Sequence, residues 1–154
     1  MARGDWKWFA QAERDLGKKV HDLELDDLRI GIVTNATVPA VNTPAPHWGG
    51  TGTTNFAANQ VPTGTAYTGP LDVVVAAWAL TAAGADLRLN NISIAQDAGG
   101  GFTTGHWGIL YNNTDANKRA IAYLDLGGPV GNVAGAIDYD WNGATNDVLR
   151  LAQA

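Results

Sequence analysis

Residues 105–128 read GHWGILYNNTDANKRAIAYLDLGG and contain the clearest strand patterns of the chain. His106–Tyr111 and Ala120–Leu126 are largely apolar and hold β-branched and aromatic residues, which favour a pleated and partly buried surface. Asn112–Asp115, which separates them, has the Asn, Thr and Asp composition of a turn. Two strands separated by a short polar turn are typical of an antiparallel sheet.

Similar patterns recur on both sides of this stretch. In Leu28–Val33 apolar residues recur at every second position, as in a half-buried strand. Further strands are predicted at residues 71–77, 86–89, 91–95, 136–141 and 148–151. No pattern long enough for a helix lies between them, which disfavours a parallel α/β sheet. The sequence therefore predicts a mainly β protein, an antiparallel sandwich or barrel.

The first 27 residues differ from this body, which spans residues 28–154. Asp5 is placed to cap a helix by accepting the free amides of the first turn. The apolar residues behind it recur at helical spacing: Trp6, Phe9, Ala10, Leu16 and Val20. We expect one N-terminal α-helix that ends between Gly17 and His21, followed by an acidic linker over residues 23–27.

Residues 35–70, called the excursion below, have almost no hydrophobic periodicity. The excursion holds all but one of the 6 prolines of the chain and a Gly-Thr-rich cluster at residues 49–54. We interpret it as a long loop with at most one short strand. Loops of this length are uncommon unless they are functional or ordered by a partner.

Composition excludes several classes of function. Only 16% of the 154 residues are charged, and the net charge is −5 without a basic run. Nucleic acids and anionic membranes both bind through clustered positive charge, so neither partner is expected. The chain has no cysteine and no apolar window long enough for a membrane span. A surface with little charge favours contact with other protein subunits, because little charge has to be desolvated.

No set of residues predicts an enzyme, a cofactor site or a metal site. The three histidines, His21, His47 and His106, lie far apart, and Ser93 is the only serine. Asp138–Gly143 begins like a calcium-binding loop, with oxygen ligands at Asp138, Asp140 and Asn142, but its twelfth position is Leu149 instead of Glu. We interpret it as a strand with exposed aspartates and leave calcium binding open.

Aromatic residues in polar surroundings are the candidate contacts with other proteins. The helix carries Trp6, Trp8 and Phe9 on more than one face, and the excursion carries His47, Trp48, Phe56 and Tyr67. Aromatic side chains are enriched at the centres of protein interfaces. The alternative is that these side chains pack only within the protein's own core.

The order of these segments resembles a group of small virion structural proteins of tailed phages. The resemblance lies in the Trp-containing N-terminal segment, in residues 27–34, in the Gly-Thr-Gly and Tyr-Thr-Gly loops of the excursion, and in Gly105–Asn113 and Ala120–Gly128. It departs at residues 35–61, where relatives tend to have Tyr-Thr-Pro-Asp and more acidic residues. Such proteins are similar to capsid decoration, or cement, proteins, which implies a jelly-roll-like β-sandwich.

The resemblance also implies a function. A cement protein binds the outside of the assembled capsid and bridges neighbouring major capsid subunits, and it often associates with itself as a dimer or trimer. It would be made in the bacterial host cytoplasm and end on the capsid surface. The alternative is a tail- or fibre-associated structural protein or an adhesin for host-surface glycans, in which Trp48 and the polar loops of the excursion would contact the sugar.

Overall fold

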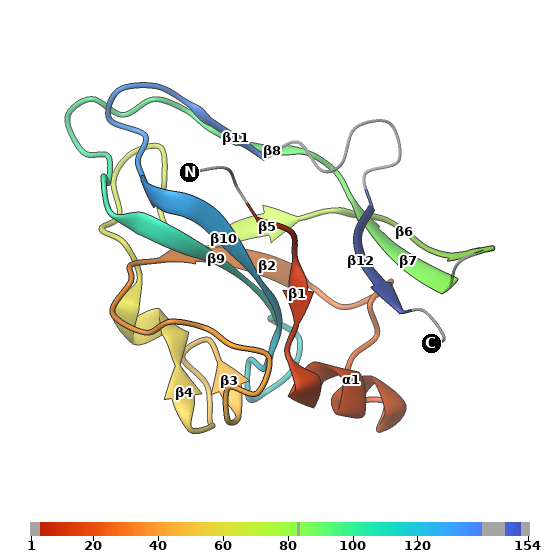
Figure 1. Ribbon diagram of the computed structural model, residues 1–154. Coiled ribbons are helices and arrows are strands. Elements are labelled where there is room, and N and C mark those ends of the chain that lie inside the picture. Colours follow the sequence, from red (N-terminus) through yellow and green to blue (C-terminus); the bar gives the residue numbers. More distant parts are fainter. Residues whose placement is uncertain (1–3, 83, 140–146, 152–154) are drawn as a thin grey trace.

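The protein is a mainly β structure of antiparallel sheets with one α-helix, as predicted (Figure 1). A computed structural model describes residues 4–82, 84–139 and 147–151. Within this part of the chain one strand pair is parallel, a short one in the excursion, and the other pairs are antiparallel.

The central sheet has five strands in the order β1-β10-β9-β2-β5. They are β1 (Lys7–Trp8), β10 (Ala120–Val130), β9 (Gly105–Asn112), β2 (Leu28–Val33) and β5 (Leu71–Val73). Ile30 pairs with Leu110, which in turn pairs with Ala122 on β10. The two strands predicted from residues 105–128 are thus neighbours at the centre of the fold, with the predicted strand 28–33 beside them.

A second group of strands completes the sandwich. It consists of the sheet β12-β7-β6 and the pair β11-β8. Their bounds are β6 (Val75–Thr81), β7 (Gly84–Leu89), β8 (Ile92–Ile94), β11 (Ile137–Tyr139) and β12 (Asp147–Leu151). Leu87, Ile94 and Leu149 from this group are buried in the same hydrophobic cluster as Ile30 and Leu110 of the central sheet. One core therefore joins both groups of strands.

The N-terminal helix begins later in the chain than predicted. The helix α1 spans Ala10–Gly17, and its N-cap residue, Phe9, makes no side-chain capping hydrogen bond. Asp5 is not the cap, because the chain before Phe9 is extended and Lys7 and Trp8 pair with β10 as strand β1. Pairing with the backbone groups at the edge of β10 replaces helix formation at Lys7 and Trp8. Phe9 stabilises this arrangement by packing on Tyr123, with ring centroids 5.0 Å apart.

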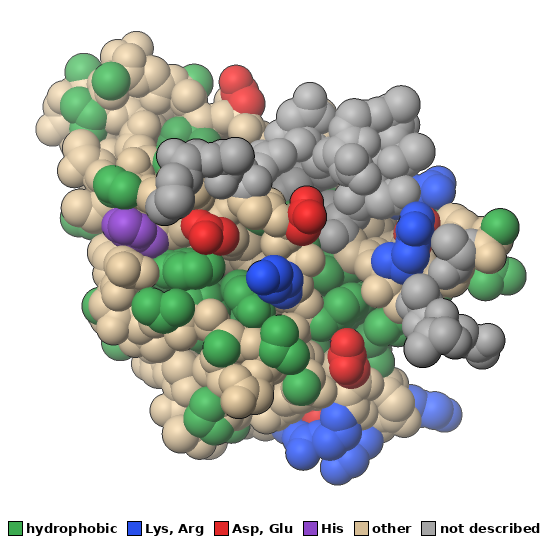
Figure 2. Space-filling view, viewed as in Figure 1, with side chains coloured by type: hydrophobic (Ala, Val, Ile, Leu, Met, Phe, Trp, Pro, Cys, Tyr) green, Lys and Arg blue, Asp and Glu red, His purple; other side chains and the backbone are tan. Residues whose placement is uncertain are grey.

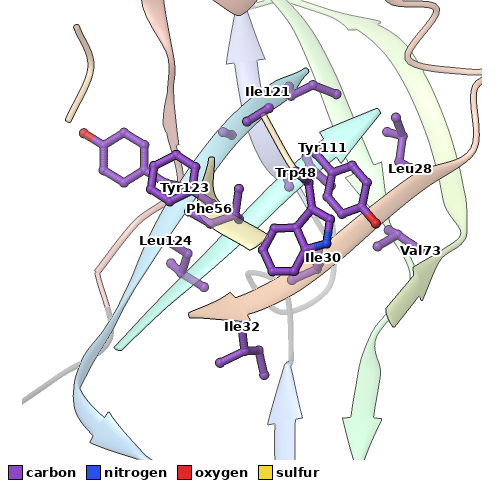
Figure 3. Packing of buried hydrophobic residues seen from close by; sticks show 14 of the residues in the cluster. Leu28, Ile30, Ile32, Trp48, Phe56, Val73, Tyr111, Ile121, Tyr123 and Leu124 are labelled. Atoms are coloured by element: carbon purple, nitrogen blue, oxygen red, sulfur yellow. The ribbon is translucent and has the colours of Figure 1, made fainter. Parts of the chain in front are cut away.

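The excursion is ordered by the chain itself. It contains two short parallel strands, β3 (Pro46–His47) and β4 (Thr54–Asn55), and the 3₁₀ helix η1 (Phe56–Asn59). Figure 3 shows Trp48 and Phe56 from this segment beside Tyr111 and Tyr123 of the central sheet. The Trp48 ring lies parallel to that of Tyr111, 5.4 Å away. The excursion thus covers one face of the central sheet, although its sequence lacks strand periodicity.

Candidate interaction surfaces

Most of the predicted interface residues are part of the core. Phe9, His47, Trp48, Phe56 and Tyr67 are buried within the chain. The structure thus places these five candidate interface residues in the protein's own interior, which is the alternative stated above. Four of them belong to the excursion, which folds back on the central sheet and buries its aromatic side chains there.

Trp48 shows how tightly this cover is fitted. Its exposed fraction is 8%, and its backbone amide donates to the carbonyl of Lys118. A Cβ atom added at Gly31 would lie 2.1 Å from the Trp48 ring, so the absent side chain of Gly31 makes room for the indole. A residue held in this way does not offer a ring to a glycan, which removes the anchor that the adhesin alternative requires.

Trp6 and Trp8 also serve the fold. Both are half-buried and pack against the core cluster. The indole of Trp8 donates to the backbone carbonyl of Arg150 at 3.1 Å, which ties β1 to β12. These two tryptophans therefore hold the N-terminal segment against the sandwich.

The possible calcium loop lies partly outside the described residues, since Asp140 and Asn142 are among those not described. Asp138 is described, on β11, where it accepts a hydrogen bond of 2.6 Å from the hydroxyl of Ser93. Within the described part of the chain no three His, Cys, Asp or Glu side chains are grouped to hold a metal ion.

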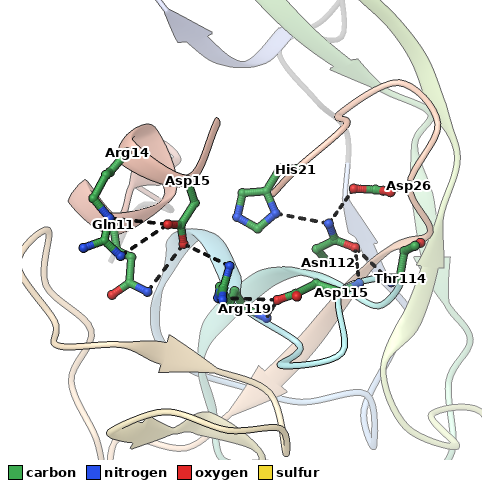
Figure 4. A network of polar contacts seen from close by, with 9 residues as sticks. All are labelled: Gln11, Arg14, Asp15, His21, Asp26, Asn112, Thr114, Asp115 and Arg119. Atoms are coloured by element: carbon green, nitrogen blue, oxygen red, sulfur yellow. Dashed lines mark hydrogen bonds and ion pairs between the residues drawn. The ribbon is translucent and has the colours of Figure 1, made fainter. Parts of the chain in front are cut away.

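The buried polar residues form structural networks. Near α1, His21 and Asp26 both contact the amide of Asn112, at 3.1 and 2.5 Å, while Gln11, Arg14 and Arg119 surround Asp15 (Figure 4). Burial lowers the pKa of His21, which favours its neutral form. This network fastens the linker before β2 to the turn between β9 and β10.

A second network lies at the other end of β9. Asp97 accepts hydrogen bonds from the backbone amide and hydroxyl of Thr65, both at 2.8 Å, and from the backbone amides of Gly100 and Ala66. These bonds, that from the Thr65 hydroxyl first, lower the pKa of Asp97 to about 2. Asp97 thus links the end of the excursion to the loop before β9. Its lone pairs are occupied by these donors, which suits a structural role better than a catalytic one.

The outer surface of the excursion is free of charge. No Asp, Glu, Lys or Arg occurs between Arg29 and Asp72. Val38 and Val41, 59% and 50% exposed, are its most exposed large apolar side chains. We call this outer surface of residues 35–70 the excursion face. Figure 2 shows green and tan surface without charged side chains at the lower left, where Figure 1 places much of the excursion.

A second uncharged surface is the edge of the sheet β12-β7-β6. Residues 73–85 hold no charged side chain, and within the described structure β6 pairs only with β7. Leu80 is 90% exposed near the tip of the hairpin between β6 and β7. Natural edge strands are usually protected by charges, prolines or bulges. The register of β6 is irregular between Val75 and Ala77, but its tip beyond this point carries neither charge nor proline.

An open pocket of about 480 Å³ lies next to this edge. Trp78 of β6 and Leu151 of β12 line one part of it, and Leu16 and Leu23 line another. Charged residues at the pocket are Lys19, Asp22 and Glu24. The four apolar residues of this mixed lining can receive an apolar side chain.

Neither surface was predicted as such from the sequence. The available signal was the run of uncharged residues through 30–85, interrupted only by Asp72. The aromatic residues do not mark these surfaces, because large aromatic side chains are also the ones that the core of a small protein buries. No described helix is both long and apolar enough to span a membrane.

Comparisons of this chain with protein-family models, with curated proteins and with solved structures found no match.

Proposed function

We propose that the protein is a capsid cement protein of a tailed phage, which binds the outside of the assembled shell and bridges neighbouring major capsid subunits. The observation that carries this proposal is the uncharged excursion face with Val38 and Val41 exposed. Docking such a face removes little charge from water, so the buried apolar area is not offset by desolvation. The resemblance of the chain to small phage virion proteins is the reason for proposing a phage capsid as the particle that it binds.

The ordered loops also suit this function. Trp48, stacked on Tyr111, and Phe56, in the same core cluster, hold the excursion to the central sheet, and hydrogen bonds from Thr65 to Asp97 hold its C-terminal end. A surface that is already ordered loses little conformational entropy on binding. Many copies on a symmetric shell add to this, because weak contacts become effective when they are repeated.

The alternative is a tail- or fibre-associated structural protein. It would use the same uncharged surface, so the two proposals differ in the particle component that is bound. Its adhesin form is disfavoured, because Trp48 is buried against Tyr111. We propose no enzymatic activity, since the buried carboxylates Asp15, Asp86 and Asp97 are held by protein donors.

Co-sedimentation with expanded shells of the phage that encodes the protein tests the proposal. We expect the wild-type protein to sediment with the shells and to raise the temperature at which they open. Lysines at both Val38 and Val41 should weaken shell binding by roughly tenfold or more, because two charges would have to be buried. Leu25→Lys is the matched control, since Leu25 is 82% exposed on the linker before β2.

Two results would overturn this proposal. One is that wild-type protein stays in the supernatant with expanded shells. The other is that the Val38 and Val41 lysine variant binds as the Leu25→Lys control does. Co-sedimentation with purified tails or fibres in place of shells would support the alternative.

A further inference from the structure

The pairing of β6 with β7 determines which backbone N–H and C=O groups of β6 point to its outer edge. Thr81 pairs with Gly84 across a turn of two intervening residues, so these two form the hydrogen-bonded pair that closes the hairpin. Hydrogen-bonded and non-hydrogen-bonded pairs alternate in an antiparallel ladder. Leu80 and Trp78, opposite Ala85 and Leu87, therefore turn their N–H and C=O groups away from β7.

The side chains of the same two residues share one face of this sheet. Trp78 lies opposite Leu87, which lies opposite Leu149, and both leucines are buried. Leu80 continues this face beyond the core and is 90% exposed. Trp78 lines the open pocket. Within the described part of the chain, the edge thus combines backbone groups that no other strand pairs, an exposed leucine and a recess lined in part by apolar residues.

We infer that two copies of this chain pair antiparallel through β6 around a two-fold axis at Ala79. In this register Trp78 of one copy lies opposite Leu80 of the other, and the reverse, so both outward pairs exchange their N–H and C=O groups. Side chains of directly opposed strand residues lie close together on one face. Leu80 of each copy therefore packs beside Trp78 of the other, at the border of its pocket.

A second copy is the occupant that this edge fits, because a two-fold contact places the same surface on both sides. A charged side chain near the axis would lie close to the same side chain of the second copy and repel it. Residues 73–85 carry no charged side chain. The exposed leucine and the pocket supply a projection and a recess on each copy. The contact is small compared with the roughly 800 Å² per partner of a stable complex, so we expect a weak dimer that is reinforced on a shell.

This inference rests on the proposed function for its biological setting. It goes further by naming a dimer and the strand, β6, through which the two copies meet. Its test needs no shell, so that failure of either proposal is seen separately. The excursion face and the β6 edge are different parts of the chain. Lysines at Val38 and Val41 should therefore leave dimerisation unchanged, while changes at Leu80 should impair it.

Cysteine crosslinking tests the register, and the chain contains no cysteine that would interfere. Residues on the axis form a non-hydrogen-bonded pair with Cα atoms about 4.5 Å apart, within the range that a disulfide spans. We expect Ala79→Cys to give a disulfide-linked dimer under mild oxidation, at least roughly tenfold faster than Leu25→Cys. Equal rates for the two variants would overturn the proposed register.

Sedimentation equilibrium of the purified chain tests the pairing itself. Wild-type protein should dimerise at concentrations up to the order of 1 mM, and Leu80→Lys should weaken dimerisation by roughly tenfold or more by placing two lysines near the axis. Leu80→Pro should have a similar effect, because it removes an outward N–H that β7 does not use. Leu25→Lys should dimerise as the wild type does.

The stability of each variant is measured by urea unfolding, so that a folding defect is recognised. A wild-type protein that stays monomeric over the whole range would overturn the inference. A Leu80→Lys variant that dimerises normally would do the same. If both variants at Leu80 unfold, the Ala79→Cys crosslinking rate decides, since that change adds only a small side chain at a half-buried position.

Discussion

At the scale of single residues, the fold depends on one absent side chain. Gly31 lies in the middle of β2, and the Trp48 ring occupies the space that its Cβ would fill. This close approach lets the excursion lie flat on the central sheet. A glycine in a strand is otherwise unfavourable, so its presence here reflects packing.

Gly31→Ala should therefore displace Trp48 and lower the free energy of unfolding by about 1–3 kcal/mol, the usual cost of overpacking a core. Urea unfolding followed by tryptophan fluorescence measures the change. Gly17→Ala is the matched control, because a Cβ at Gly17 would meet no atom within 4 Å. The control should be neutral or slightly stabilising, as alanine is favoured over glycine in a helix. Equal stability of Gly31→Ala and wild type would contradict the proposed packing.

At the scale of elements, β12 is held to β7 by an ion pair as well as by backbone pairing. Arg150 contacts both carboxylate oxygens of Asp86, at 2.6 and 2.9 Å. The Asp86 carboxylate is buried, and the hydrogen bond from Arg150 lowers its pKa. Removal of the arginine would leave a buried carboxylate without its main partner, which costs far more than the loss of an exposed pair.

Arg150→Met should thus destabilise the protein by more than the ~1 kcal/mol that exposed pairs reach. Arg29→Met is the control, because Arg29 pairs with Asp27 and Asp72 at the surface. Hydrogen exchange of the β12 amides, together with urea unfolding, measures both variants. If Arg29→Met is as damaging as Arg150→Met, the ion pair of β12 has no special role.

At the scale of the whole molecule, one polar network lies at Asn112, the last residue of β9, and another at Asp97, in the loop before β9, and they respond to pH in different ranges. Burial lowers the pKa of His21 below 6.5, so the folded state favours neutral histidine. Its contribution to stability is full above pH 6.5 and declines as pH falls through the lowered folded pKa. Hydrogen bonds lower the pKa of Asp97 from 3.8 to about 2, so its contribution declines as pH falls from about 4 to about 2.

The free energy of unfolding, measured against pH, should reveal both groups. The difference between wild type and His21→Gln should change below pH 6.5 and level off once the folded histidine is protonated. The difference between wild type and Asp97→Asn should change only below about pH 4. A pH-independent difference for His21→Gln would show that His21 is not held neutral by burial.

The amino-acid sequence was sufficient to predict the fold class and most of the strands. Leu28–Val33, His106–Tyr111 and Ala120–Leu126 were recognisable because their apolar patterns are local and the turns beside them have turn composition. The continuation of β10 to Val130, through two glycines and a proline, was not predicted. The sequence also determined that the surface carries little charge, which is a property of composition alone. Both follow from residue types and short spacings.

The start of the helix, the role of the aromatic residues and the position of β6 at an edge of the described sheet depend on tertiary contacts. Trp6 and Trp8 fit a helical pattern, yet the open backbone groups of β10 draw Lys7 and Trp8 into a strand. Trp48 and Phe56 became core residues because the excursion returns to the sheet. The exposed edge of β6 depends on which strand lies beside it. Each of these outcomes is set by contacts between residues far apart in the chain, which local patterns do not contain.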